Sequence, residues 1–130
     1  MSVDKLFLDA NLLFSVAYRP DSAIASLWRM KNVELLTSAY AAEEAMRNLA
    51  DEEQRHKLTA LLGQMRIVTG ASPLPHGVLL PEKDRPILQA AIHAEATHLL
   101  TGDQRHFDKH YGKRYGGVLI LPPGDYVRRG

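Results

Sequence analysis

Leu6-Phe7-Leu8-Asp9 and Leu99-Leu100-Thr101-Gly102-Asp103 are the two stretches that decide the fold of this chain. Each is a short apolar run followed by an aspartate. Asp9 directly follows Leu8, and Asp103 lies three residues after Leu100. An apolar run of this length indicates a strand buried on both faces of a sheet. Because the carboxyl ends of parallel strands open onto one edge of a sheet, the two aspartates are predicted to face one crevice.

The rest of the sequence alternates strand patterns with helix patterns. Such alternation predicts an α/β fold, in which helices cover both faces of a parallel sheet. Three prolines and two glycines between positions 70 and 81 predict a loop. The expected strands are 5–8, 33–37, 66–69, 97–100 and 118–121, and the expected helices are 11–18, 22–30, 38–49, 51–65, one from Asp84 onward, 104–110 and a last turn from Asp125.

Length and composition limit which classes of protein this chain can belong to. The 130 residues predict a single domain, 1–130, and a hydrophobic content of 45% is that of an ordinary globular protein. The net charge of +1 gives no bulk attraction to nucleic acid, so such binding needs a local patch. The absence of cysteine excludes disulfides, thiolate zinc sites and cysteine nucleophiles. Without a membrane-length apolar run or a signal-peptide pattern, we expect a cytoplasmic protein that has no membrane contact.

Three aspartates lie where predicted strands and helices meet, and two interpretations compete for them. Asp9 and Asp103 follow buried strands, and Asp84 begins a helix with Pro86 in its first turn. Each could simply cap the helix that follows, since aspartate is a favoured N-cap residue. Each could instead line the crevice, where gathered acids repel one another unless a cation lies between them. The second interpretation predicts a magnesium or manganese site.

Neighbouring residues suggest how these acids are held. Asn11 could hydrogen-bond to Asp9 and orient it, and Thr101 could donate a hydrogen bond to a neighbouring acid or to a metal-bound water. Gly102 would let the backbone turn sharply off the strand and leave Asp103 at the edge.

Two adjacent glutamates offer a fourth acid. Glu43 and Glu44 point about 100° apart around the predicted helix, so only one can face the crevice. Ser38, Tyr40 and Glu43 could form an approximate capping arrangement, which leaves Glu44 as the better ligand candidate. A solvated surface position is the alternative for a lone helical glutamate.

Taken together, these residues resemble the PIN-domain nucleases. The resemblance spans about residues 4–125 and rests on Leu6-Phe7-Leu8-Asp9-Ala10-Asn11, Thr37-Ser38 with Glu44 beyond it, Asp84, and Leu100-Thr101-Gly102-Asp103. It implies a three-layer α/β/α sandwich with a central parallel sheet of about five strands, and metal-dependent hydrolysis of RNA. It assigns catalysis and the binding of Mg²⁺ or Mn²⁺ to Asp9, Glu44, Asp84 and Asp103, and supporting positions to Asn11 and Thr101. Asp108, five residues past Asp103, could be an accessory acid, and a surface position on a short helix is the alternative.

Within that family the chain is similar to the small VapC-type toxins, ribonucleases that a partner antitoxin holds inactive. This subgroup implies an RNA substrate and a cognate antitoxin, and we expect a homodimer. Helices between Ser22 and Met65 could form a groove for an antitoxin peptide or a second subunit, although Trp28 is more typical of a core, as is the stripe Leu58, Leu61, Leu62 and Met65. A free-standing RNA-processing nuclease and a non-catalytic magnesium-binding module are the alternatives.

Basic residues and histidines flank the proposed acids. A positive rim around a negative pocket could bind RNA phosphates, and a solvated face is the alternative for each basic residue. His106 and His110 share a predicted helix face at i, i+4, which could bind zinc, but two nitrogens without a third ligand favour a structural role. His106 could instead contact phosphate. The basic candidates are Lys83, Arg85, Arg105, Lys109, Lys113 and Arg114.

Overall fold

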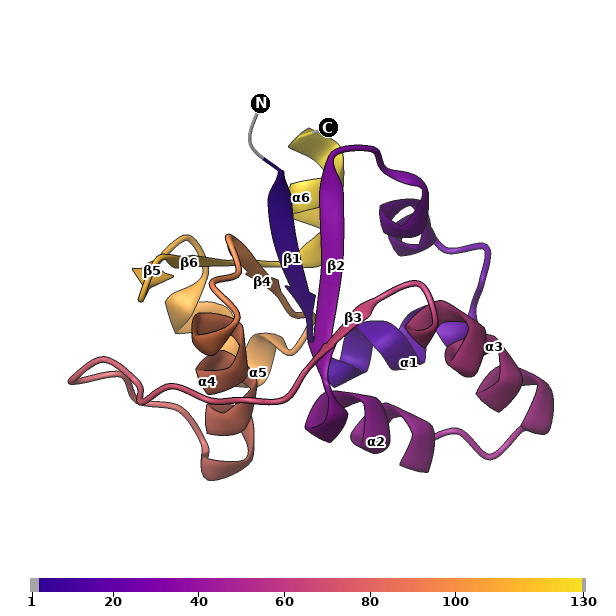
Figure 1. Ribbon diagram of the computed structural model, residues 1–130, viewed down its shortest axis with the longest axis horizontal. Helices are drawn as coiled ribbons and strands as arrows, with labels where there is room; N and C mark the ends of the chain where they lie inside the picture. The colour runs from indigo at the N-terminus through magenta and orange to yellow at the C-terminus, as the bar shows by residue number, and fades with distance from the viewer. Residues whose placement is uncertain (1–2, 130) are drawn as a thin grey trace.

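The computed structural model describes residues 3–129, which form a six-stranded sheet flanked by helices (Figure 1). The strand order is β3-β2-β1-β4-β6-β5, and every neighbouring pair is parallel except β5 and β6. The elements are β1 (Asp4–Leu8), α1 (Ala10–Tyr18), η1 (Ala23–Arg29), β2 (Val33–Ser38), α2 (Ala39–Arg47), α3 (Glu52–Leu62), β3 (Arg66–Val68), η2 (Glu82–Asp84), α4 (Arg85–His93), β4 (His98–Leu100), α5 (Gln104–Phe107), η3 (Asp108–His110), β5 (Arg114–Tyr115), β6 (Val118–Leu121) and α6 (Pro123–Arg129), where η marks a 3-10 helix.

The strand β1 lies inside the sheet and is buried along its apolar half. Leu6, Phe7 and Leu8 are fully buried, as the uninterrupted apolar run predicts. The strand pairs with β2 on one side and with β4 on the other, where Leu8 lies opposite Leu100. Because the strand order reverses at β1, its carboxyl end opens the crevice in which α/β proteins bind ligands.

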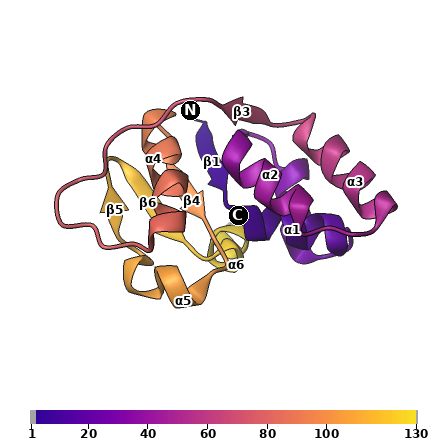
Figure 2. The same cartoon turned by 90° about the horizontal axis from the view of Figure 1, so that it is seen from below.

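Helices lie on both sides of β1. In Figure 1 and Figure 2, α4 lies on one side of this strand, and α1 and α3 lie on the other. The helix α4 packs against β2 and β4, whereas α1 packs against α2 and α3. The carboxyl ends of β1 and β2 point to the bottom of Figure 1, and Figure 2 looks onto this edge. The architecture is therefore the predicted α/β arrangement.

The sequence reading missed one strand. β5 forms an antiparallel hairpin with β6, so five strands of the sheet are parallel and the edge strand is not. Gly116 and Gly117 connect the two strands, and both have positive φ, at 55° and 84°. A two-residue hairpin turn of type I′ requires positive φ at both positions, which glycine adopts without strain. The Gly-Gly pair between short strands was the available signal.

Two helical segments differ from expectation. The segment predicted as a helix over 22–30 is the 3-10 helix η1, in which the Ser26 hydroxyl donates to the Ala23 carbonyl at 2.7 Å. This side-chain bond competes with the α-helical pattern. The last turn predicted from Asp125 is instead the helix α6, in which Tyr126 donates a hydrogen bond to Asp4 on β1 at 2.6 Å. Among residues 3–129, no helix has both the length and the apolar character to cross a membrane.

Stability should depend on the strands around β1. Leu36 on β2 is fully buried, whereas Leu79 in the loop before η2 is 82% exposed. We expect Leu36→Ala to lower the free energy of unfolding by about 2–5 kcal/mol through the cavity it leaves. The same substitution at Leu79 should change it by less than about 0.5 kcal/mol. Urea unfolding followed by circular dichroism measures both, and equal losses would contradict this packing.

Candidate functional site

Four carboxylates from four separate elements line one pocket of about 340 Å³. Asp9 follows β1, Glu44 lies in α2, Asp84 ends η2 and Asp103 follows β4. The convergence predicted from the sequence is therefore present in the fold. The pocket falls within the roughly 300–1,000 Å³ range of small-ligand sites.

Asp9 is held by hydrogen bonds at both carboxylate oxygens. The Ala10 amide donates to Oδ1 at 2.7 Å, and the Thr101 hydroxyl donates to Oδ2 at 2.8 Å. Burial chiefly, and the charges of Asp84 and Glu44 to a smaller extent, raise the pKa of Asp9 to about 6 against the lowering effect of the two hydrogen bonds. Asp9 thus combines both predicted roles, because it caps α1 and also faces the crevice.

Thr101 connects the carboxyl ends of β1 and β4. Its hydroxyl donates to Asp9 as predicted, and the same oxygen accepts from the Asp103 amide at 3.2 Å and from Asn11 Nδ2 at 3.4 Å. The expectation that Asn11 binds Asp9 directly was wrong. Asn11 instead accepts a hydrogen bond from the Gly102 amide at 3.1 Å, so it positions the backbone beside Asp103.

Gly102 does not act as predicted. Its φ is not positive, and an added Cβ would meet Asn11 Oδ1 at an ordinary 3.7 Å. The turn from β4 into α5 therefore does not require glycine. Instead, the hydrogen bonds of Thr101 and Asn11 to the amides of residues 102 and 103 hold it in place.

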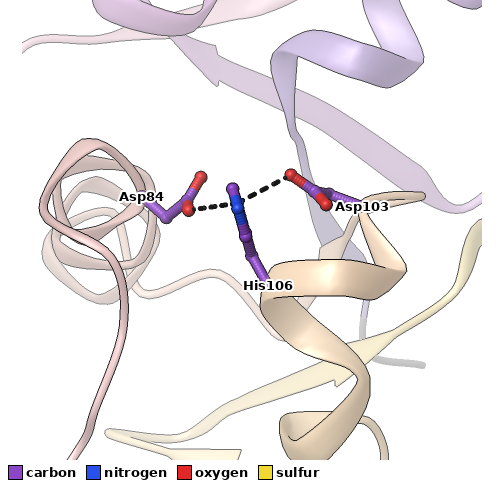
Figure 3. A group of neighbouring side chains, drawn as sticks. All are labelled: Asp84, Asp103 and His106. Atoms are coloured by element: carbon purple, nitrogen blue, oxygen red, sulfur yellow. Dashed lines mark ion pairs between the residues drawn. The ribbon is translucent and has the colours of Figure 1, made fainter.

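Neither Asp84 nor Asp103 caps its helix with a side-chain hydrogen bond, so the capping interpretation was wrong for both. Pro86 does lie in the first turn of α4, as predicted. Asp84 is buried, and burial raises its pKa, with His106 acting in the opposite direction. Both carboxylates turn toward His106, whose ring lies between them (Figure 3).

His106 Nδ1 lies 2.7 Å from Asp84 Oδ2 and 2.9 Å from Asp103 Oδ2. These distances are those of ion pairs, yet neither contact has the alignment of a hydrogen bond, and both Nδ1 and Asp84 Oδ2 are buried without a hydrogen-bond partner. A charge interaction needs proximity and not a fixed angle, so the two contacts are electrostatic, while the hydrogen-bonding capacity of Nδ1 and of Asp84 Oδ2 stays unused. Sequence reasoning gave His106 a mainly structural role, and the signal it missed was the i, i+3 spacing from Asp103.

The predicted helix face shared by His106 and His110 does not exist. The helix ends at Phe107, and His110 belongs to the 3-10 helix η3. There His110 contacts the Tyr115 hydroxyl at 2.8 Å and the Leu79 carbonyl at 3.0 Å. His110 therefore has the structural role that was favoured for both histidines.

Of the two glutamates, Glu44 lines the pocket and Glu43 is exposed. Ser38 caps α2 by accepting a hydrogen bond from the Ala41 amide at 3.1 Å, as predicted. Tyr40 has a different role from the suggested capping arrangement, because its hydroxyl donates to the Lys83 carbonyl at 2.9 Å. This bond ties η2 to α2 and so fixes the positions of Glu44 and Asp84 relative to each other.

The remaining candidate residues differ in whether they line the pocket. Lys83 lines the pocket, together with Asn11 and two residues that sequence reasoning missed, Phe14 and Asn48. Asp108 is exposed and does not line the pocket, so it has no position from which to assist the four acids. Also outside the pocket lining are the basic candidates Arg85, Arg105, Lys109, Lys113 and Arg114.

The side chains present fit a divalent cation. Among residues 3–129, the cluster of ligand atoms that lie within 4.8 Å of one another comprises Asp84, Asp103 and His106. Asp84 contributes a buried oxygen without a hydrogen-bond donor, which a cation would satisfy. Asp9 and Glu44 line the same pocket outside this cluster. Carboxylate oxygens are the ligands that Mg²⁺ and Mn²⁺ prefer.

The raised pKa of Asp9 makes a prediction about stability in metal-free buffer. Because the folded protein binds this proton more tightly than the unfolded chain does, stability should fall as the pH rises from about 4 to about 6. The loss attributable to Asp9 should approach about 3 kcal/mol. Urea unfolding with a chelator from pH 4 to pH 7 measures it. Asp9→Asn should remove most of this slope and the exposed Asp108→Asn should keep it, so parallel curves for wild type and Asp9→Asn would contradict the assignment.

No protein-family model matches the sequence, and no curated protein sequence matches it significantly. Solved structures do share the fold. A chain of the VapBC-1 structure from nontypeable Haemophilus influenzae has a TM-score of 0.62 and 13% identity, covering 92% of this chain and 98% of that chain. A chain of the VapBC2 structure from Rickettsia felis, bound to a DNA fragment from their promoter, has a TM-score of 0.63 and 16% identity, covering 91% of this chain and 98% of that chain.

At these low identities the likeness is one of fold. Both of these chains come from VapBC structures, and their fold agrees with the fold expected from the resemblance in the sequence. The coverage extends over nearly the whole chain, so the fold prediction is confirmed for the sheet and its helices together. The chain has the α/β fold of the chains in these VapBC structures.

Proposed function

We propose that this chain is an endoribonuclease that hydrolyses RNA phosphodiester bonds with the help of Mg²⁺ or Mn²⁺. The observation that carries the proposal is the convergence of Asp9, Glu44, Asp84 and Asp103 on one pocket, although they are far apart in the sequence. Gathered acids cost stability unless a cation neutralises them, so their presence favours a function that needs the cation.

A divalent cation held by these acids would supply Lewis-acid stabilisation of the charge that develops on a phosphodiester during hydrolysis. The protein residues would bind and orient. Thr101 and the Ala10 amide hold the Asp9 carboxylate in one orientation, through hydrogen bonds of 2.8 and 2.7 Å. Lys83, which lines the pocket and is exposed, is placed to attract an RNA phosphate. Asp9, Glu44, Asp84 and Asp103 are the proposed catalytic residues.

Removal of one acid tests the activity. Purified protein should cleave RNA in Mn²⁺ or Mg²⁺, and a chelator should abolish the cleavage reversibly. Asp103→Asn should lower the cleavage rate at least about 100-fold, because it removes a charge from the cation site. Glu43→Gln, one residue from Glu44 but exposed, is the matched control and should retain the rate. Full activity in both Asp9→Asn and Asp103→Asn would remove these residues from the mechanism.

The more specific proposal is that the chain is the toxin of a type II toxin–antitoxin pair. Its support is that the two solved structures described above are VapBC structures and that they match this chain over nine-tenths of its length. A protein partner would then restrain the nuclease. A free-standing processing nuclease would have the same pocket without such a partner.

The gene beside this one separates the two possibilities. We expect an adjacent reading frame to encode a small protein that forms a complex with this chain and inhibits RNA cleavage when the two are mixed at equal concentration. Cleavage measured with increasing amounts of that protein gives the stoichiometry, and serum albumin serves as the control. A neighbouring product without effect on cleavage would favour the free-standing nuclease.

A further inference from the structure

We propose that His106 is itself a metal ligand, which binds through Nδ1 beside Asp84 and Asp103, and that this nitrogen makes the site prefer Mn²⁺ over Mg²⁺. The inference rests on the proposed function, because it assumes that the acid pocket holds a divalent cation. It goes beyond that function by adding a ligand that is not a carboxylate and by choosing between the two metals.

The spacing of the three ligand atoms supports this role. Neighbouring ligands of an octahedral cation with bonds of about 2.1 Å lie about 3 Å apart. Nδ1 lies 2.7 Å from Asp84 Oδ2 and 2.9 Å from Asp103 Oδ2, and all three groups fall within 4.8 Å of one another. The nitrogen therefore already lies at nearly the separation from each oxygen that a shared cation requires.

A second observation is independent of the spacing. Asp84 has a side chain only 9% exposed, and its Oδ2, like His106 Nδ1, is buried without a hydrogen-bond partner. Two polar atoms that approach so closely in the interior would normally form an aligned hydrogen bond. Their misalignment leaves both atoms unsatisfied, and a cation between them would satisfy both.

The local fold fixes the ring in this position. Asp103 precedes the first residue of α5, and His106 lies three residues later on the same face (Figure 3). The fully buried Phe107 anchors this short helix to the core. An imidazole nitrogen binds first-row transition metals better than it binds Mg²⁺, which prefers oxygen ligands and retains its waters. The three residues thus supply two oxygens and one nitrogen, a set that suits Mn²⁺ better than Mg²⁺.

A rival role for His106 makes the opposite prediction. A protonated imidazole could replace the cation between the two carboxylates when no metal is bound. It would then compete with every divalent cation equally and would have to leave when the metal enters. Removing the ring would strengthen the binding of both metals under this role, whereas it would weaken Mn²⁺ selectively if Nδ1 is a ligand.

Pulsed electron paramagnetic resonance of the Mn²⁺-loaded wild-type protein tests the ligand directly. We expect a hyperfine coupling from a directly bound nitrogen, which changes when the histidines are labelled with heavy nitrogen. His106→Asn should remove the coupling, because its amide can offer an oxygen but no imidazole nitrogen. His56→Asn, an exposed histidine on α3, is the matched control and should keep it. The wild-type spectrum decides the question even if a variant folds poorly.

Calorimetric titration of both metals gives the selectivity. His106→Asn should lower the preference for Mn²⁺, expressed as the ratio of the two dissociation constants, by about tenfold. An unchanged ratio, tighter binding of both metals or a spectrum without nitrogen coupling would overturn the inference while leaving the metal site intact. A wild-type protein that binds neither metal would overturn the proposed function as well, so the two failures are distinguishable.

Discussion

The pairing of β1 with β4 is the constraint on which the site depends. Leu8 lies opposite Leu100, and the Asp9 amide donates to the Leu100 carbonyl at 3.1 Å. This register brings Asp9 and Thr101, which are 92 residues apart in the sequence, within one hydrogen bond of each other. A slip of one residue would turn the side chains of a strand to the opposite face of the sheet. The acidic pocket is therefore a consequence of strand register and not of any local motif.

Burial and the gathered acids together determine the electrostatics of this region. Burial raises the pKa of Asp9 to about 6, and burial together with the charges of Asp103, Asp108, Asp9 and Asp125 raises the pKa of Tyr111 to about 12. Tyr111 donates to the Thr101 carbonyl at 2.8 Å, so this protonated phenol helps to hold the junction that carries Asp103. Neutral donors, such as the hydroxyls of Thr101 and Tyr111, thus hold the carboxylates and the backbone around them in place. Such an arrangement suits a site that binds a cation, because the stability it costs returns when the cation binds.

Two contacts between elements complete the pocket. The bond from Tyr40 to the Lys83 carbonyl holds η2 against α2, and His106 joins η2 to α5 through its contacts with Asp84 and Asp103. The hydrogen bonds between strands do not connect α2, η2 and α5, so these side-chain contacts link them. The loop before η2 is long and rich in proline, so these side-chain contacts, together with the packing of α4 against β2 and β4, hold Asp84 at the edge where β1 and β4 end.

The sequence by itself determined the alternation of the five parallel strands with helices and identified the four acids, because buried apolar runs and carboxylates after strands are local patterns. It also identified Thr101 as a donor to a neighbouring acid and Glu44 as the glutamate that faces the crevice. It did not determine the β5–β6 hairpin, the 3-10 form of η1 or the partners of Asn11, because short hairpins and side-chain bonds compete closely with alternatives of similar energy. Only the tertiary structure decided that Asp84 also turns to His106, which places the imidazole between two carboxylates and leaves the start of α4 without a side-chain cap. This contact depends on the distance between α4 and α5 in the fold. The spacing of residues along the chain does not predict that distance.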